Sequence, residues 1–149
     1  MPPLLRLVST TSFALLLAGC VTPYTPKPGA ALANITFVNK GYTSVDMHYE
    51  ACGVFEPSML LASLHPGASA TQRVTANEPF SFSFIARVGE DWSCSLGFLT
   101  FTPVPEGRYE IEFSQTGSGP PARCSVKVSK LEASGARVPQ PTTDCRRRP

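Results

Sequence analysis

Apolar and polar residues alternate along most of the middle of the chain, which is the pattern of half-buried β-strands. The alternation is clearest over 108–114, where Tyr109, Ile111 and Phe113 are predicted to face inward. It recurs from Phe80 to Val88, where every second residue is apolar. The same pattern predicts strands over 34–39, 44–51, 92–102 and 123–131, and a weaker, more polar strand over 68–75.

Turn-forming residues separate these runs, with Pro, Gly, Asn or Asp at 66–67, 77–79, 88–91, 105–107 and 117–121. Segment 56–64 fits either one helical turn or a strand, since Pro57 allows both. Short strands at short spacing, without a long amphipathic helix, predict an all-β chain folded as an antiparallel β-sandwich of about seven strands. Such a sandwich resembles immunoglobulin-like or transthyretin-like modules in architecture, and a closed barrel is the alternative.

The first twenty residues have a different pattern. Arg6 supplies a positive charge, and residues 7–17 are apolar except for Ser and Thr. This stretch is shorter than the roughly 20 residues that span a bilayer, and its layout is that of a secretory signal peptide. It ends in Leu17-Ala18-Gly19-Cys20, which resembles the lipobox of bacterial lipoproteins.

The resemblance implies cleavage before Cys20, diacylglycerol on its thiol and a further acyl chain, such as palmitate, on the new amino terminus. Two or three chains anchor a protein stably to a membrane. Val21, where an Asp would favour inner-membrane retention, favours the outer membrane, with the protein facing the periplasm. An ordinary secreted protein and an uncleaved N-terminal anchor are the alternatives. The covalent lipid is the only bound group expected.

The pattern divides the chain into four parts. Residues 1–19 are the signal peptide, and residues 20–33 are the lipidated Cys20 followed by a Pro-rich tether. Residues 34–138 form the sandwich domain, and residues 139–149 are a C-terminal tail. The tail closes with three arginines, which are either solvated or in contact with anionic headgroups.

The cysteines support an exported protein. The chain has five, and with Cys20 assigned to lipid four remain: Cys52, Cys94, Cys124 and Cys145. An exported chain with four cysteines is expected to form two disulfides. The favoured pairing is Cys52–Cys94 with Cys124–Cys145, because the second bridge would pin the tail to a strand. No pair has the CxxC spacing, which argues against a zinc site.

Composition excludes several classes of protein. Charged residues make up 16% of the chain, and the formal net charge is +2. This net charge is too small for a broad surface that contacts nucleic-acid phosphates, so no nucleic-acid partner is expected. The 42% hydrophobic content argues against disorder of the whole chain. The 15 prolines argue against a helical bundle.

One strand carries a weak candidate for chemistry. Asp46, His48 and Glu50 alternate with apolar residues, so they are expected on one face of the strand over 44–51. Two carboxylates and an imidazole can hold a divalent metal or a proton. The simpler interpretation is a solvated strand face, so no metal is expected.

A second candidate lies beside the turn predicted over 88–91. Trp92 follows Glu90 and Asp91, and an aromatic residue with a polar rim is typical of binding sites. The alternative is that Trp92 belongs to the core.

Motifs of catalysis are missing from the sequence. It has no GxSxG elbow, no HExxH, no phosphate-binding glycine loop and no dinucleotide fingerprint, so an enzyme is not expected. The expected function is a membrane-anchored binding or structural module that contacts an envelope protein or the cell wall. One alternative is an inhibitor of an envelope enzyme, using the loop at 53–57 or at 88–92. A hydrolase is a weaker alternative, with His48 and His65 as its only conventional bases.

Overall fold

The computed structural model describes residues 22–52, 58–87, 93–117 and 123–145. Within these ranges the chain forms ten β-strands and no helix, which confirms the all-β prediction. None of the described residues belongs to a helix with the length and apolarity needed to cross a membrane. The strands are β1 (Leu32–Asn39), β2 (Val45–Tyr49), β3 (Met59–Leu64), β4 (Ser69–Thr75), β5 (Phe80–Arg87), β6 (Ser93–Phe101), β7 (Arg108–Thr116), β8 (Arg123–Leu131), β9 (Arg137–Pro139) and β10 (Thr143–Asp144).

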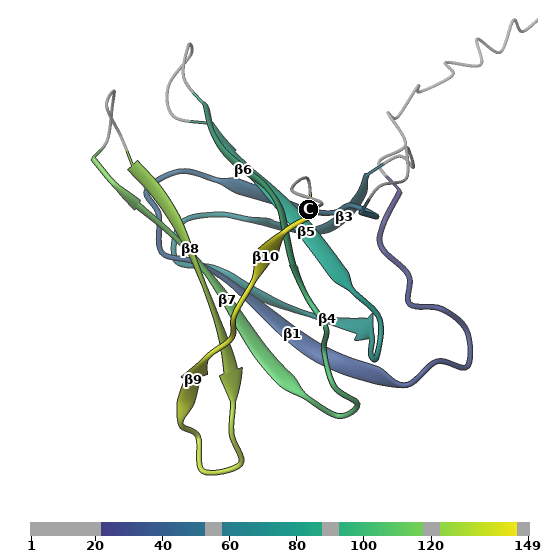
Figure 1. Cartoon of the computed structure of the whole chain (residues 1–149). Helices are drawn as coiled ribbons and strands as arrows, with labels where there is room; N and C mark the ends of the chain where they lie inside the picture. The colour runs from purple at the N-terminus through teal and green to yellow at the C-terminus, as the bar shows by residue number, and fades with distance from the viewer. Residues whose placement is uncertain (1–21, 53–57, 88–92, 118–122, 146–149) are drawn as a thin grey trace, which may run out of the picture.

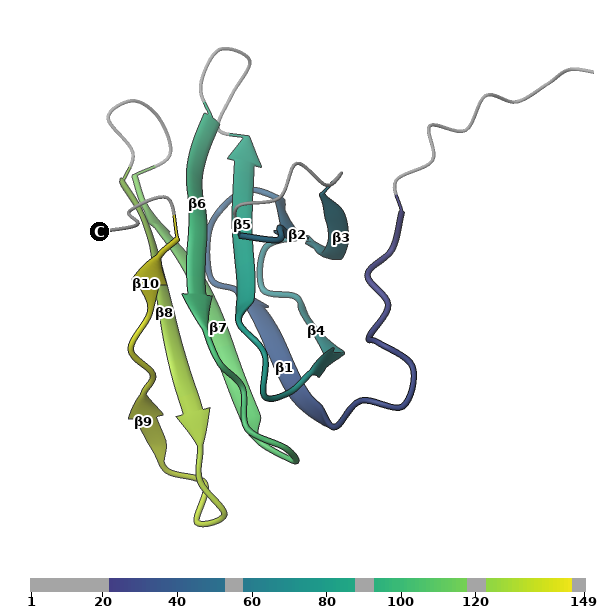
Figure 2. The same cartoon turned by 45° about the vertical axis from the view of Figure 1, so that its right-hand side comes forward.

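The strands form two five-stranded sheets that pack face to face (Figures 1 and 2). One sheet has the order β4-β1-β7-β8-β9 and the other the order β10-β6-β5-β2-β3. The predicted sandwich is therefore confirmed over the closed barrel. Among the described strands every ladder is antiparallel except that of β1 with β7, which is parallel from Asn34 opposite Arg108 to Asn39 opposite Phe113.

The core lies between the sheets and follows the alternation seen in the sequence. Four phenylalanine side chains are at most 2% exposed: Phe80, Phe82 and Phe84 of β5 and Phe113 of β7. Phe84 and Phe113 meet edge to face across the two sheets, with ring centroids 4.9 Å apart. Burying one such ring contributes about 2–3 kcal/mol, so these side chains hold the two sheets together.

The folded region extends beyond residues 34–138 at both ends. β1 begins at Leu32, and the segment expected to be a tail contributes β10, which pairs with β6. The ambiguous segment 56–64 forms β3. β3, β9 and β10 raise the number of strands above the expected seven. These segments lack a clear alternation of apolar and polar residues, and they become strands because each pairs with a neighbouring strand.

The disulfides join Cys52 to Cys145 and Cys94 to Cys124, with Cα–Cα distances of 5.8 Å and 6.2 Å. The prediction of two disulfides is confirmed, but the favoured pairing of Cys52 with Cys94 and of Cys124 with Cys145 is wrong. The tail is still pinned by a bridge from Cys145. Its partner follows β2 instead of lying in β8.

Sheet geometry explains why Cys52 does not reach Cys94. Cys52 Sγ contacts the hydroxyl of Ser81, near the start of β5. Cys94 lies opposite Ala86, near the end of the same strand. Five residues of strand separate these two positions, which is roughly 16 Å.

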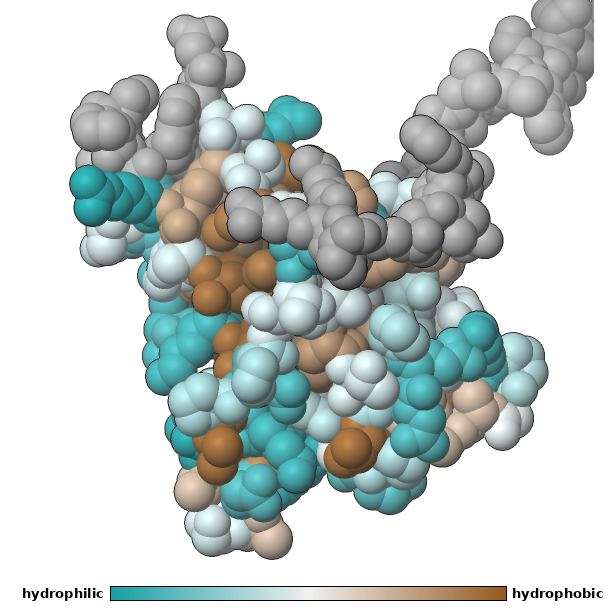
Figure 3. Space-filling model, in the orientation of Figure 1, coloured by the Kyte–Doolittle hydropathy of each residue, from teal (hydrophilic) through white to brown (hydrophobic). Residues whose placement is uncertain are grey.

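The bridge from Cys94 to Cys124 connects β6 with β8, which belong to different sheets. In Figure 3 apolar residues gather between these two strands, on a surface that is otherwise mostly polar. Leu99 of β6 and Val126 of β8 are partly buried and pack against the core. The bridge and these side chains therefore close this flank of the sandwich.

Candidate functional site

Residues 22–27, which we call the strap, cross the free edge of β3 before β1 begins (Figures 1 and 2). Pro23 lies opposite Leu60 in a parallel bridge. Leu60 N donates to Thr22 O at 3.0 Å, and Tyr24 N donates to Leu60 O at 2.9 Å. The strap thus continues the sheet by one short pairing and covers the edge of β3.

Tyr24 fixes the strap to the core. Its side chain is 9% exposed, and its ring centroid lies 4.9 Å from that of Tyr49 and 6.2 Å from that of Phe80. Thr75 N donates to the Tyr24 hydroxyl at 3.3 Å. A buried tyrosine with a bonded hydroxyl contributes both apolar area and a satisfied polar end, so Tyr24 acts as the anchor point of the strap.

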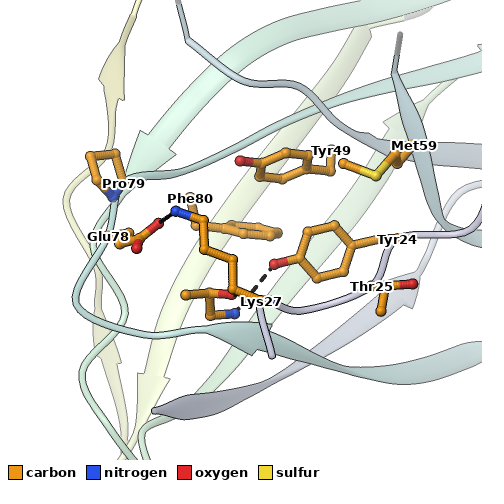
Figure 4. Close-up of a pocket in the computed structure, with 9 residues that line it drawn as sticks. Tyr24, Thr25, Lys27, Tyr49, Met59, Glu78, Pro79 and Phe80 are labelled. Atoms are coloured by element: carbon orange, nitrogen blue, oxygen red, sulfur yellow. Dashed lines mark hydrogen bonds and ion pairs between the residues drawn. The ribbon is translucent and has the colours of Figure 1, made fainter. Parts of the chain in front are cut away.

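These three rings border a hollow of about 140 Å³ (Figure 4). Met59 lies beside them, while Lys27 reaches across to Glu78 at one side of the hollow. The hydrogen bond with Glu78 raises the pKa of Lys27 above its usual 10.5, so this ammonium group stays charged at neutral pH. Ring faces and a thioether next to an ion pair suit one small apolar or aromatic group with a polar end.

A second hollow, of about 290 Å³, lies on the outward face of the sheet that contains β5 and β6. Ser83 donates to Glu50 Oε1 at 2.5 Å on one side of it, and Ile85, 45% exposed, supplies an apolar wall. Phe98 borders it with a φ of 64°, at the irregular part of the β5–β6 ladder. A positive φ is unusual for an aromatic residue. It occurs here where the β5–β6 ladder is irregular, which is a β-bulge that borders this hollow.

The three residues of the weak metal hypothesis do not converge. Asp46 Oδ1 accepts a hydrogen bond from Ser63 Oγ at 2.6 Å, while Glu50 Oε1 accepts one from Ser83 Oγ. His48 Nδ1 is buried and has no hydrogen-bond partner among the described residues. The described residues contain no group of three His, Cys, Asp or Glu side chains that could hold a metal ion. The register shift between Met47 and His48 lies in the ladder with β3, while β2 stays in continuous register with β5, where Asp46 lies opposite Ile85 and His48 opposite Ser83.

Several predicted site residues lie outside the described ranges. These are Cys20, the proposed binding residues Glu90, Asp91 and Trp92, the loop segments 53–57 and 88–92, and the arginines at 146–148. Their predictions stay predictions.

The sequence did not single out Tyr24. It stands between Pro23 and Pro26, in a segment that its prolines mark as a tether. The available signal was one aromatic residue in a segment with little else to bury, since a large apolar ring stabilises a fold only where it is buried.

His65 is exposed, and its Nδ1 lies 3.1 Å from Ser44 Oγ.

A comparison with protein families finds no model that matches this sequence, and a comparison with curated proteins finds no significant match.

Proposed function

We propose that the protein is a lipoprotein of the bacterial cell envelope, anchored through Cys20, whose sandwich acts as a non-catalytic binding or structural module. The observation that carries the proposal is Leu17-Ala18-Gly19-Cys20 at the end of an apolar signal. The disulfides support the proposal, because they pair the four cysteines that follow Cys20 with one another and neither bridge uses Cys20. Disulfides persist in oxidising compartments, which suits the periplasmic side of the outer membrane.

The module's partner is a protein or polymer of the envelope. Two concave surfaces support a binding role: the hollow bordered by Tyr24, Tyr49 and Phe80, and the hollow on the outward face of β5 and β6. Aromatic residues next to polar groups are typical of recognition surfaces.

The anchor is tested by the variant Cys20→Ser. Without the thiol no diacylglycerol can be attached, so the variant is expected to leave the membrane fraction or to stay unprocessed. Fractionation with immunoblotting measures both. The matched variant Val21→Ala keeps the thiol and is expected to remain in the membrane at the mature mass. A Cys20→Ser protein that stays membrane-bound at the mature mass would contradict the anchor.

The binding role is tested by purification of the lipidated protein from detergent extracts of the membrane. A partner in fixed proportion to the protein is expected, and it should also co-purify with the double variant His48→Ala/His65→Ala. If the cellular activity of the protein is lost in this double variant while the fold and partner are retained, the non-catalytic proposal fails and the hydrolase is favoured.

A further inference from the structure

We propose that the edge of the sandwich formed by β3 and the strap rests directly on the headgroups of the membrane, so that the domain is held against the bilayer instead of hanging from a long tether. This inference rests on the proposed lipid anchor at Cys20. It adds an orientation and a docking surface, whose occupant is the lipid surface itself.

The distance between anchor and domain carries the inference. Thr22 is already bonded to β3, because its carbonyl oxygen accepts from Leu60 N at 3.0 Å. Cys20 precedes Thr22 by two residues, and two residues of extended chain span at most about 7 Å. Neighbouring strands lie about 5 Å apart, so the lipid-bearing Cα is within about 12 Å of β3. Lipid chains that enter the bilayer at Cys20 therefore bring β3 to the headgroups.

The strap is held at several points, which is why the short distance persists. Tyr24 packs among the rings of Tyr49 and Phe80, and Lys27 pairs with Glu78. Lys27 N also donates to Thr75 Oγ1 at 3.0 Å.

Release of the strap would change the reach of the anchor severalfold. The next backbone contact along the chain to the body of the sandwich is Ala31, whose carbonyl oxygen accepts from Ala76 N at 2.8 Å. Eleven residues separate it from Cys20, and at full extension they span roughly 36 Å.

The chemistry of this edge suits a headgroup layer. Thr22, Thr25 and Ser58 expose hydroxyl groups, which can bond to phosphate and glycerol oxygens. Tyr24 and Tyr49 lie just behind them. Tyr24 is buried there and its hydroxyl accepts from Thr75 N, so it holds this edge to the core.

The test measures the water layer between the bilayer and the protein. The full mature lipidated protein is inserted into a supported bilayer of phosphatidylethanolamine and phosphatidylglycerol, and neutron reflectometry gives the thickness of that layer. We expect protein density to begin at the headgroups, with a water layer of less than about 10 Å. Tyr24→Ala, which removes the ring that holds the strap, should open a layer of tens of ångströms, bounded by the roughly 36 Å reach.

Two further variants keep the test decisive. A twelve-residue Gly/Ser insertion between Val21 and Thr22 should widen the layer without touching the fold. Ser134→Ala removes an exposed hydroxyl from the turn between β8 and β9, in the sheet that does not contain β3, and should leave the layer unchanged. A wide layer in the unmodified protein, or the same layer with and without the insertion, overturns the inference. If the lipid anchor itself is wrong, the Cys20→Ser protein will attach to the bilayer to the same extent as the unmodified protein. That result distinguishes failure of the anchor from failure of the docking inference.

Discussion

At the scale of single residues, Asn39 at the end of β1 shows how one buried polar side chain fixes the local structure. It is fully buried, and its Nδ2 donates to Thr43 O at 2.9 Å and to Leu64 O at 3.0 Å. Its Oδ1 accepts from Gly41 N at 2.8 Å. One amide thereby fixes the turn between β1 and β2 and the end of β3. The sequence shows an Asn at a strand end, but not the three partners that the fold gathers around it.

Asn39→Ala is expected to lower the free energy of unfolding by about 2–3 kcal/mol, because it leaves buried backbone groups without their partners. Urea unfolding followed by circular dichroism measures the change. Asn34→Ala is the matched control, since Asn34 lies on the same strand but is only half-buried, and its effect should be clearly smaller. Equal losses in the two variants would show that the amide bonds of Asn39 do not matter.

At the scale of elements, the alternation predicts the long strands well. The strand over 123–131 agrees with β8 to the residue. The strand predicted over 80–88 begins where β5 begins, and the one predicted over 92–102 ends one residue after β6, while residues 88 and 92 lie outside the described ranges. Period-two burial is a local property of the sequence, so it is readable there. The short strands β9 and β10 are different, since they depend on partners far along the chain.

The disulfide pairing escapes prediction for the same physical reason. Which cysteines meet depends on the order of strands within the sheets, where β10 lies beside β6 and the parallel pair of β1 with β7 joins distant segments. Local alternation contains no information on that order, so the number of bridges was predictable and their partners were not. The hollow at Tyr24 likewise needs the strap to cross β3.

The edge strand β9 is held by an ion pair across its sheet. Arg137 Nε donates to Glu110 Oε1 at 2.8 Å and its Nη2 donates to Oε2 at 3.0 Å. The Glu110 side chain is 14% exposed and that of Arg137 is 57% exposed, so solvent screens the pair from one side. The hydrogen bonds from Arg137 lower the pKa of Glu110 below its usual 4.5.

Glu110→Gln is expected to lower the free energy of unfolding by about 1 kcal/mol at neutral pH, where the carboxylate is charged. Because the folded pKa lies below 4.5, this contribution is complete above that value and is lost as the pH falls towards the folded pKa. The gap between variant and unmodified protein should therefore narrow in urea unfolding below pH 4.5. Glu106→Gln, in an exposed turn, serves as control. A gap that is constant or grows in acid contradicts the pair.

At the scale of the whole molecule, the first and last described segments lie at the two edges of one sheet. The strap lies along β3, and β10 lies along β6 at the opposite edge, where Cys145 N donates to Phe98 O at 3.1 Å. Covered edges protect a sheet from pairing with other chains. This arrangement also turns the segment expected to be a tether into part of the fold, which places the proposed lipid within two residues of a strand.

The lipid anchor at Cys20 is measured most directly by mass spectrometry of the N-terminal peptide of protein purified from membranes. We expect the mature chain to begin at Cys20, and the peptide to carry the added mass of a diacylglyceryl group and an amide-linked acyl chain. An unmodified Cys20 peptide, or a mature chain that begins at any other residue, would contradict it.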